Sequence, residues 1–220
     1  LSVRNRTGGD KLIGLENAAG SEEWHISINP SGNNEGLLLE NNNNPDAIIM
    51  VEAGGNIGIG TSQPDTDMKL DVNGEIRGTK VWNSVWNDIA DYQLLDDELV
   101  FGKCYFDTRS GAKVCRQRCQ QSVIGIATDT FGFGVGQNLH EKEVPIAVAG
   151  WVLAFVDKEY DCGVPLTNDE NGVLTEMTPE EKQQYPERLV AIYKKKETDE
   201  YWGDAHEKIA VNNRHWVKVK

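Results

Sequence analysis

The most restrictive feature of this 220-residue sequence is a run in which isoleucine alternates with glycine, Gly54-Gly55-Asn56-Ile57-Gly58-Ile59-Gly60. It predicts very short strands whose single apolar stripe is too small to close a core within one chain, so several copies must wind together to bury it. The next piece, Leu70-Asp71-Val72-Asn73-Gly74-Glu75-Ile76-Arg77, predicts a β-hairpin, because Asn-Gly favours a tight turn and the flanking residues alternate.

Residues 1–80 continue this pattern. Short alternating pieces at Trp24–Asn29, Gly36–Glu40 and Ala47–Val51 are each followed by a segment rich in glycine, asparagine or proline. Strand and turn therefore recur about every dozen residues. Because the strands are short and their apolar sets are small, the sequence predicts a thin β-shaft rather than a sandwich.

The composition and net charge limit the kinds of molecule that this chain is expected to bind. The net charge is −13 and the mean hydropathy is −0.51, with 39% hydrophobic residues. A chain with so little core per residue usually gains stability by oligomerising. Its negative charge opposes binding to nucleic acid and to anionic membrane surfaces, so neither is expected as a partner. No apolar stretch is long enough to span a bilayer, and we expect no secretory signal.

The remainder of the chain divides into a junction at 81–93 and a second domain at 94–220. In the junction, Val81, Val85 and Ile89 recur at four-residue intervals, as do Trp82 and Trp86, which fits a short helix or an extended arm whose aromatics dock on a neighbour. Residues 94–220 predict a β-rich globular head. Thr178-Pro179-Glu180-Glu181 is a helix start, so we expect an all-β protein with one or two short helices.

Two sets of motifs carry a resemblance to a known class of protein. The run Gly55-Asn56-Ile57-Gly58-Ile59-Gly60-Thr61, continued by Leu70 to Arg77, resembles a motif near the C-terminal ends of phage tail fibres and other trimeric surface fibres. Trp86-Asn87-Asp88-Ile89-Ala90-Asp91-Tyr92 resembles the self-cleavage point of the autoproteolytic intramolecular-chaperone domain of phage appendage proteins, a glutamic-type peptidase family. Gly102–Gly111, Val123–Ala127 and Val144–Gly150 follow in that family's order.

The resemblance implies a homotrimer that belongs to the virion, in a tail fibre or appendage, and assembles in the host cytoplasm. Its head would drive trimerisation and set the register of the shaft upstream in the same chain. It also implies a scissile bond between Asn87 and Asp88, with Asp91 at the position of the catalytic acid. The family usually has glutamate there, whereas Asp91 is shorter by one methylene.

The chemistry of the junction leaves three alternatives open. A carboxylate near the bond can act as a general base if burial raises its pKa, and the Asn87 amide can instead attack its own carbonyl carbon. Alternatively, Asp88 and Asp91 are a solvated helix face, and the domain trimerises without cutting. Any enzyme activity would be a single self-cleavage. A different function is a permanent receptor-binding tip or decoration fibre that contacts a host glycan or protein.

Other motifs give weaker signals. Cys115 and Cys119 are spaced too widely for a usual zinc knuckle, so buried free thiols are expected, with a Cys104–Cys115 or Cys115–Cys119 disulfide as the alternative. Gly132–Gly136 lacks the Lys-Ser/Thr of a nucleotide loop and is interpreted as a mobile loop between strands. The four histidines are scattered, and no serine-hydrolase signature occurs. We therefore expect no metal and no cofactor.

Overall fold

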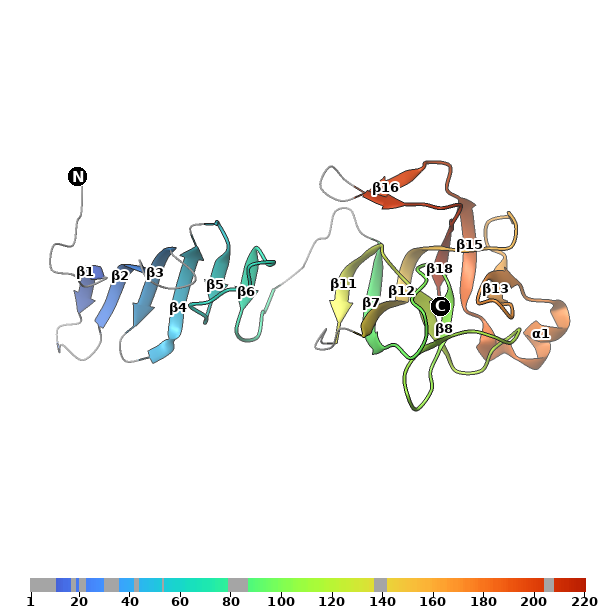
Figure 1. Cartoon of the computed structure of the whole chain (residues 1–220), viewed down its shortest axis with the longest axis horizontal. Helices are drawn as coiled ribbons and strands as arrows, with labels where there is room; N and C mark the ends of the chain where they lie inside the picture. Colours follow the sequence, from blue (N-terminus) through green and yellow to red (C-terminus); the bar gives the residue numbers. More distant parts are fainter. Residues whose placement is uncertain are drawn as a thin grey trace. The chain divides into compact units, whose positions relative to one another are not determined.

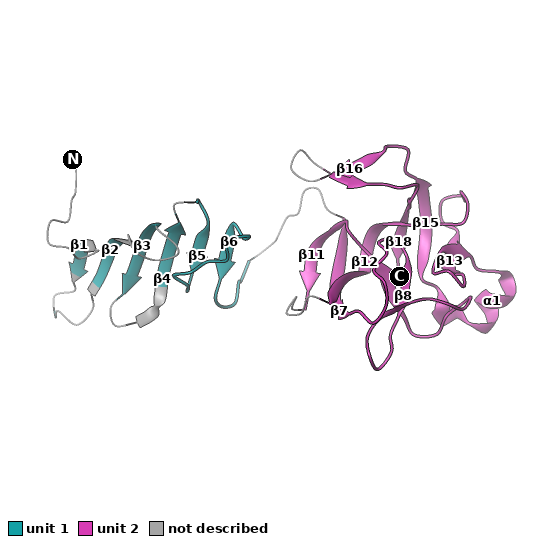
Figure 2. Ribbon diagram, in the orientation of Figure 1, with its two compact units in different colours: residues 1–81 teal, residues 82–220 magenta. Residues whose placement is uncertain are grey.

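The chain forms two compact units, Leu1–Val81 and Trp82–Lys220, which are called the N-terminal and the C-terminal unit below (Figure 2). This computed structural model describes residues 11–16, 19, 23–29, 36–41, 44–52, 54–78, 87–136, 142–203 and 208–220. The described part is mainly β-strand with one short α-helix and one 3-10 turn, which confirms the predicted all-β class.

The N-terminal unit is one six-stranded sheet whose strands lie side by side in chain order (Figure 1). Neighbouring strands from β1 to β5 are antiparallel, as expected for strands joined by short turns. The three alternating pieces that the sequence indicated are confirmed as strands. The strands are β1 (Lys11–Glu16), β2 (Glu23–Asn29), β3 (Gly36–Asn41), β4 (Asn44–Glu52), β5 (Ile57–Ile59) and β6 (Leu70–Val72).

The predicted Asn73-Gly74 hairpin is wrong. β6 pairs with β5 in parallel, with Ile57 opposite Leu70 and Ile59 opposite Val72, and residues 75–78 form no strand. The reason is the loop at residues 60–69, which carries the chain back to the start of β5, so that β6 runs in the same direction. The Ile57 amide donates to the Lys69 carbonyl and the Asn73 amide to the Ile59 carbonyl, which fixes this register.

The C-terminal unit is built on a ten-stranded sheet with a separate two-stranded ribbon, β16–β17 (Figure 1). The sheet order is β14-β13-β15-β18-β12-β10-β8-β9, and β12 also pairs with β7, which pairs with β11. The elements are β7 (Asp88–Leu94), β8 (Cys104–Phe106), β9 (Lys113–Val114), β10 (Val123–Ala127), β11 (Phe131–Val135), β12 (Glu143–Ala154), β13 (Pro165–Asn168), β14 (Leu174–Glu176), α1 (Pro179–Gln184), the 3-10 turn η1 (Pro186–Arg188), β15 (Ala191–Lys196), β16 (Tyr201–Gly203), β17 (Lys208–Ala210) and β18 (His215–Val219).

The long strand β12 organises the core of this unit. Val152 and Ala154 belong to one buried cluster, Val144 and Ile146 to a second, and Leu153 to a third. Successive side chains of a strand point to opposite faces, so one apolar strand can supply cores on both of its sides. The C-terminal unit therefore closes a hydrophobic core within a single chain.

The structure bears on three predictions for this unit. Of the two alternatives for the junction at 81–93, the helix is wrong from Asp88 onward, because these residues are extended and form a strand of the sheet; residues 81–86, with Trp82 and Trp86, lie outside the described residues. Gly132–Gly136 is not a loop, because its first four residues belong to β11. Helix α1 begins as predicted, with Thr178 as N-cap and Glu181 completing a reciprocal capping box.

Candidate functional sites

One face of the N-terminal sheet is apolar and exposed. Cross-strand partners share a face of a sheet, and the register aligns two apolar rows across the strands: Ile13-Ile26-Leu39-Ile49-Ile59-Val72 and Leu37-Val51-Ile57-Leu70. Ten apolar side chains on this face, here called the apolar face, are between 36% and 56% exposed: Ile13, Leu15, Trp24, Leu37, Leu39, Ile49, Val51, Ile57, Ile59 and Leu70. Soluble monomers rarely expose so continuous an apolar surface.

The opposite face of the same sheet is covered within the chain. Leu38, Ile48 and Met50 form a small buried cluster there. Gly58 lies under its own loop, because an added Cβ would come within 2.7 Å of the Thr61 carbonyl oxygen. The two faces therefore differ in what covers them: loops and side chains of the same chain close one, and the other stays open.

Two polar side chains of the covered face share one carboxylate oxygen. His25 Nε2 lies 2.8 Å from Glu40 Oε1, and the Ser27 hydroxyl donates to the same oxygen at 2.7 Å. A buried polar group costs little free energy once it is hydrogen-bonded. This face thus supports the sheet, and the apolar face is the one available for association.

Part of the apolar face is hollowed at the β4–β5–β6 end. This hollow is lined by Trp24, Leu39, Ile48, Ile49, Ile59, Gly60, Val72, Asn73, Gly74 and Glu75. Four of these residues, Trp24, Leu39, Ile49 and Ile59, are among the ten exposed apolar side chains. A hollow of this kind accepts an apolar side chain from a second surface better than a flat sheet does.

The second candidate site is the peptide bond between Asn87 and Asp88, at the start of β7. The Asn87 carbonyl oxygen accepts a hydrogen bond from the Trp151 amide at 3.2 Å, and the Asn87 amide donates to the Thr130 carbonyl at 3.4 Å. Gly150 makes this approach sterically feasible: it has φ +101°, and an added Cβ would lie 2.5 Å from the Asn87 carbonyl oxygen. β12 is therefore held directly against this bond.

The Asp88 carboxyl group is buried beside the same bond, with only 3% of the residue exposed. Its Oδ1 accepts from the Thr130 hydroxyl at 2.8 Å, whereas its Oδ2 has no hydrogen-bond partner among the described residues. Burial raises the pKa of Asp88 to about 6, although hydrogen bonds from Thr130 and Thr128 act in the opposite direction. Asp88 thus carries a proton to much higher pH than an ordinary aspartate.

A buried ion pair lies beside the threonine that binds Asp88, because its acid, Asp129, directly precedes Thr130 in the sequence. Arg214, 2% exposed, binds Asp129 through two hydrogen bonds, Nη1–Oδ1 at 2.6 Å and Nη2–Oδ2 at 2.9 Å. The arginine also donates to the carbonyls of Val211 and Ala210. The negative charge of Asp129 is a further, smaller cause of the raised pKa of Asp88, and Arg214 partly neutralises that charge.

The predicted acid Asp91 does not join this site within one chain. Asp91 lies three residues further along β7, roughly 10 Å away at the usual rise of a strand, and on the opposite face from Asp88. Its Oδ2 accepts from Gln93 at 2.6 Å. The structure thus places Asn87 and Asp88 together with Thr130, Gly150 and the Trp151 amide, which the sequence did not single out. The polar run Thr128-Asp129-Thr130 directly after an apolar strand was the available signal.

The cysteines and the described histidines, which the sequence offered as weaker candidates, form no catalytic or metal site among the described residues. All four cysteines are free, and Cys104, Cys115 and Cys119 are buried, which raises the pKa of Cys115 to about 12. Within the described ranges, no three metal-binding side chains come together. His25 and His215 are buried, and His215 lies 2.9 Å from the Tyr193 hydroxyl, whereas His140 and His206 lie outside the described residues.

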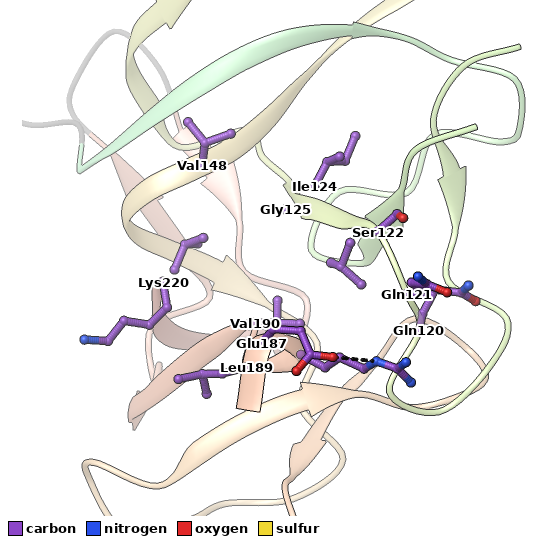
Figure 3. A pocket seen from close by; sticks show the side chains of 13 residues that line it. Gln120, Gln121, Ser122, Ile124, Gly125, Val148, Glu187, Leu189, Val190 and Lys220 are labelled. Carbon is purple, nitrogen blue, oxygen red and sulfur yellow. Dashed lines mark ion pairs between the residues drawn. The ribbon is translucent and has the colours of Figure 1, made fainter. Parts of the chain in front are cut away.

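A separate cavity of about 220 Å³ lies in the C-terminal unit, and none of the residues that line it belongs to the Asn87–Asp88 site (Figure 3). Its lining combines apolar side chains such as Val148 and Val190 with the polar groups of Gln120, Gln121 and Ser122. The Glu187–Arg188 ion pair, 3.4 Å apart, borders it. This mixed lining suits a small polar molecule better than an apolar one.

Comparison with known proteins adds no relative: no family model, curated protein or solved structure matches the chain. None of the helices in the described part is long and apolar enough to cross a membrane.

Proposed function

We propose that this chain is the C-terminal assembly region of a phage tail-fibre or appendage protein, which associates as a homotrimer through the apolar face of its N-terminal sheet. The observation that most supports this proposal is the apolar face, on which ten apolar side chains remain exposed. Burying apolar surface contributes about 25 cal/mol per Å², so copies that cover this face from water gain the stability that the isolated sheet lacks. The number three and the location in a virion rest on the motif resemblance.

The two units have complementary roles in this proposal. Strands of three to nine residues with glycine and asparagine turns specify register weakly and expose their edges until they pair. The C-terminal unit has its own core and can fold first. When three such units associate, they raise the effective concentration of the attached sheets, which then join in register. The C-terminal unit therefore acts as an intramolecular chaperone for the upstream shaft.

The association is tested by the double substitution Ile57→Ser with Ile59→Ser, which removes the apolar side chains of β5 from the face. We expect oligomers to dissociate to monomers in light scattering, while the C-terminal unit keeps its unfolding transition. The matched control is Met68→Ser with Ile76→Ser, since these residues are 54% and 74% exposed but lie outside the strands. An oligomer that survives the first pair of substitutions would contradict the proposal.

Self-cleavage at Asn87–Asp88 is the second part of the proposal. The ionised Asp88 carboxylate attacks the Asn87 carbonyl carbon through a six-membered ring, and the Trp151 amide hydrogen-bonds the developing oxyanion. The C–N bond then breaks, its nitrogen takes a proton to become the Asp88 amine, and water hydrolyses the resulting anhydride to two carboxyl groups. In the alternative route the Asn87 side-chain amide attacks, which leaves a cyclic imide on the N-terminal fragment.

Intact mass of the denatured protein, fresh and after days at neutral pH, tests this step. Two fragments that meet at Asn87–Asp88 are expected, and the imide route would make the N-terminal one lighter by a water molecule. Asp88→Ala should abolish cleavage, and Asp91→Ala should leave it in place. Cleavage that persists in Asp88→Ala but stops in Asp91→Ala would assign the reaction to Asp91, as the family resemblance implies. A single full-length mass would contradict self-cleavage, and the assembly role alone would remain proposed.

A second candidate function is a receptor-binding tip, and the cavity in Figure 3 favours it. Its amide, hydroxyl and charged groups are those that bind saccharide hydroxyls. Under this alternative the C-terminal unit contacts a host glycan and is needed after assembly, whereas an assembly domain is dispensable then. Proteolytic removal of residues 88–220 from assembled particles, followed by a host-adsorption assay, separates the two functions.

A further inference from the structure

Strand β11 forms an uncharged edge of the C-terminal sheet (Figure 1). It pairs with β7 on one side, and no described strand pairs with its other side. Residues 131–136, Phe-Gly-Phe-Gly-Val-Gly, carry no charge. Exposed edge strands are normally shielded by charges, proline or a covering element, because their free backbone groups pair readily with another chain.

The side chains of this edge are apolar and exposed on one face. Phe133 is 60% exposed, Val135 44% and Ile89, the β7 residue opposite Phe133, 41%. Phe131 differs from Phe133: a register shift between the two turns it towards Tyr92, and their rings make an edge-to-face contact at 5.9 Å. Phe131 thus packs against Tyr92 of β7, whereas Phe133 is exposed on the outer face.

The exposure of Phe133 does not come from a loosely attached strand. Gly134 lies so close to Tyr92 that an added Cβ would be 3.1 Å from its ring, and four register pairs join β11 to β7. The backbone that carries Phe133 is therefore held in place by its pairing with β7. Aromatic side chains are enriched among the residues that anchor protein interfaces.

We propose that the face formed by Phe133, Val135 and Ile89 is a contact between copies of this chain, at which the three Phe133 side chains meet around the symmetry axis. A copy is the occupant because each chain carries a net charge of −13, so copies repel least where they present few charges. Residues 131–136 carry none, and Asp91, which lies opposite Val135 on this face, is hydrogen-bonded to Gln93. β7 is also the first described strand after the N-terminal unit. Because each C-terminal unit is attached to its own N-terminal sheet, a contact at β11 and a contact between apolar faces raise each other's effective concentration. This inference rests on the proposed trimer.

Site-specific crosslinking tests the contact in the full chain. The background carries Cys162→Ser, because Cys162 is the exposed thiol and the other three are buried. Phe133→Cys is compared with Tyr201→Cys, a residue of similar exposure (53%) on β16. With a short bismaleimide, we expect the Phe133→Cys chains to migrate as crosslinked species on a denaturing gel, and the Tyr201→Cys chains to stay monomeric.

The outcomes separate this inference from the proposed function. An oligomer in light scattering that crosslinks at Tyr201→Cys, or at neither position, overturns the Phe133 contact and leaves the apolar-face proposal standing. Crosslinking at Phe133→Cys that persists when Ile57 and Ile59 are serine supports the contact and overturns the apolar face as the sole source of association. A monomer in every variant overturns both.

Discussion

The two sheets of this protein differ in how far a single chain buries their apolar side chains. In the C-terminal unit, residues such as Val152, Leu153 and Ile146 are fully buried within one chain. In the N-terminal unit the described buried apolar cluster is Leu38, Ile48 and Met50, and ten apolar residues remain exposed on the other face. The C-terminal unit covers its core apolar side chains within one chain, whereas the N-terminal sheet leaves ten of them exposed on one face.

The largest expected effect comes from removing a buried ion pair of the C-terminal unit. Arg214→Met leaves Asp129 without its partner, and removing one member of a buried ion pair costs roughly 3–5 kcal/mol. We expect the urea unfolding midpoint of the C-terminal unit to fall accordingly. The control is Arg116→Met, since Arg116 pairs with Asp97 but is 70% exposed, and such pairs contribute less than about 1 kcal/mol. Equal effects would show that the Arg214 pair adds no special stability.

A second variant should raise the stability of the same unit. The folded state keeps the proton of Asp88 up to about pH 6, whereas the unfolded chain releases it near pH 3.8. Wild-type stability therefore falls as pH rises through that window, by at most about 3 kcal/mol at pH 7. Asp88→Asn has no such loss, so its advantage over wild type should grow from pH 4 to pH 7.

Urea denaturation at the two pH values measures this difference. Asp91→Asn is the control, because Asp91 is half-buried and lies on the other face of β7. It should retain the pH dependence of the wild type. An Asp88→Asn protein with the same pH dependence as the wild type would show that Asp88 is ionised at little cost in the folded state, and would weaken its proposed role.

The smallest expected effect concerns the capping of α1. The Thr178 hydroxyl accepts from the Glu181 amide, and the Glu181 carboxylate accepts from the Thr178 amide at 2.8 Å. Thr178→Ala removes half of this box and should lower the stability of the C-terminal unit by about 1 kcal/mol. The association of the N-terminal unit should not change. Thr198→Ala, at another turn of the same unit, is a suitable control in the same urea titration.

How much the sequence could predict depended on the range of the interactions. Alternation located β2, β3 and β4, and Thr178-Pro179 located α1, because these signals are local. The pairing of β6 was not predictable, since Asn73-Gly74 is a good hairpin turn in isolation and only the 60–69 loop overrides it. The four-residue spacing that ends at Ile89 predicted a helix, whereas Asp88–Leu94 forms strand β7. The helix prediction also placed Asp91 wrongly beside Asp88, because residues three apart share a face of a helix but lie on opposite faces of a strand.

The groups around Asn87–Asp88 were hidden for the same reason. Thr130, Gly150 and Trp151 lie more than 40 residues away in the sequence and reach this bond only through the pairing of β7 with β11 and β12. The polar run Thr128-Asp129-Thr130 after an apolar strand signals a candidate site, but neither it nor the local sequence of Gly150 and Trp151 indicates contact with Asp88. By contrast, the apolar face was foreshadowed by the Ile57-Gly58-Ile59 run alone, because a strand with so small an apolar stripe cannot close a core unaided.

The central claim is that this face is buried between copies of the chain. The most direct test is the molar mass of the wild-type protein in solution, measured by light scattering across micromolar concentrations. The account predicts three times the chain mass of 24.5 kDa, unchanged on dilution. A stable species of 24.5 kDa would contradict it, because the apolar face would then remain in water.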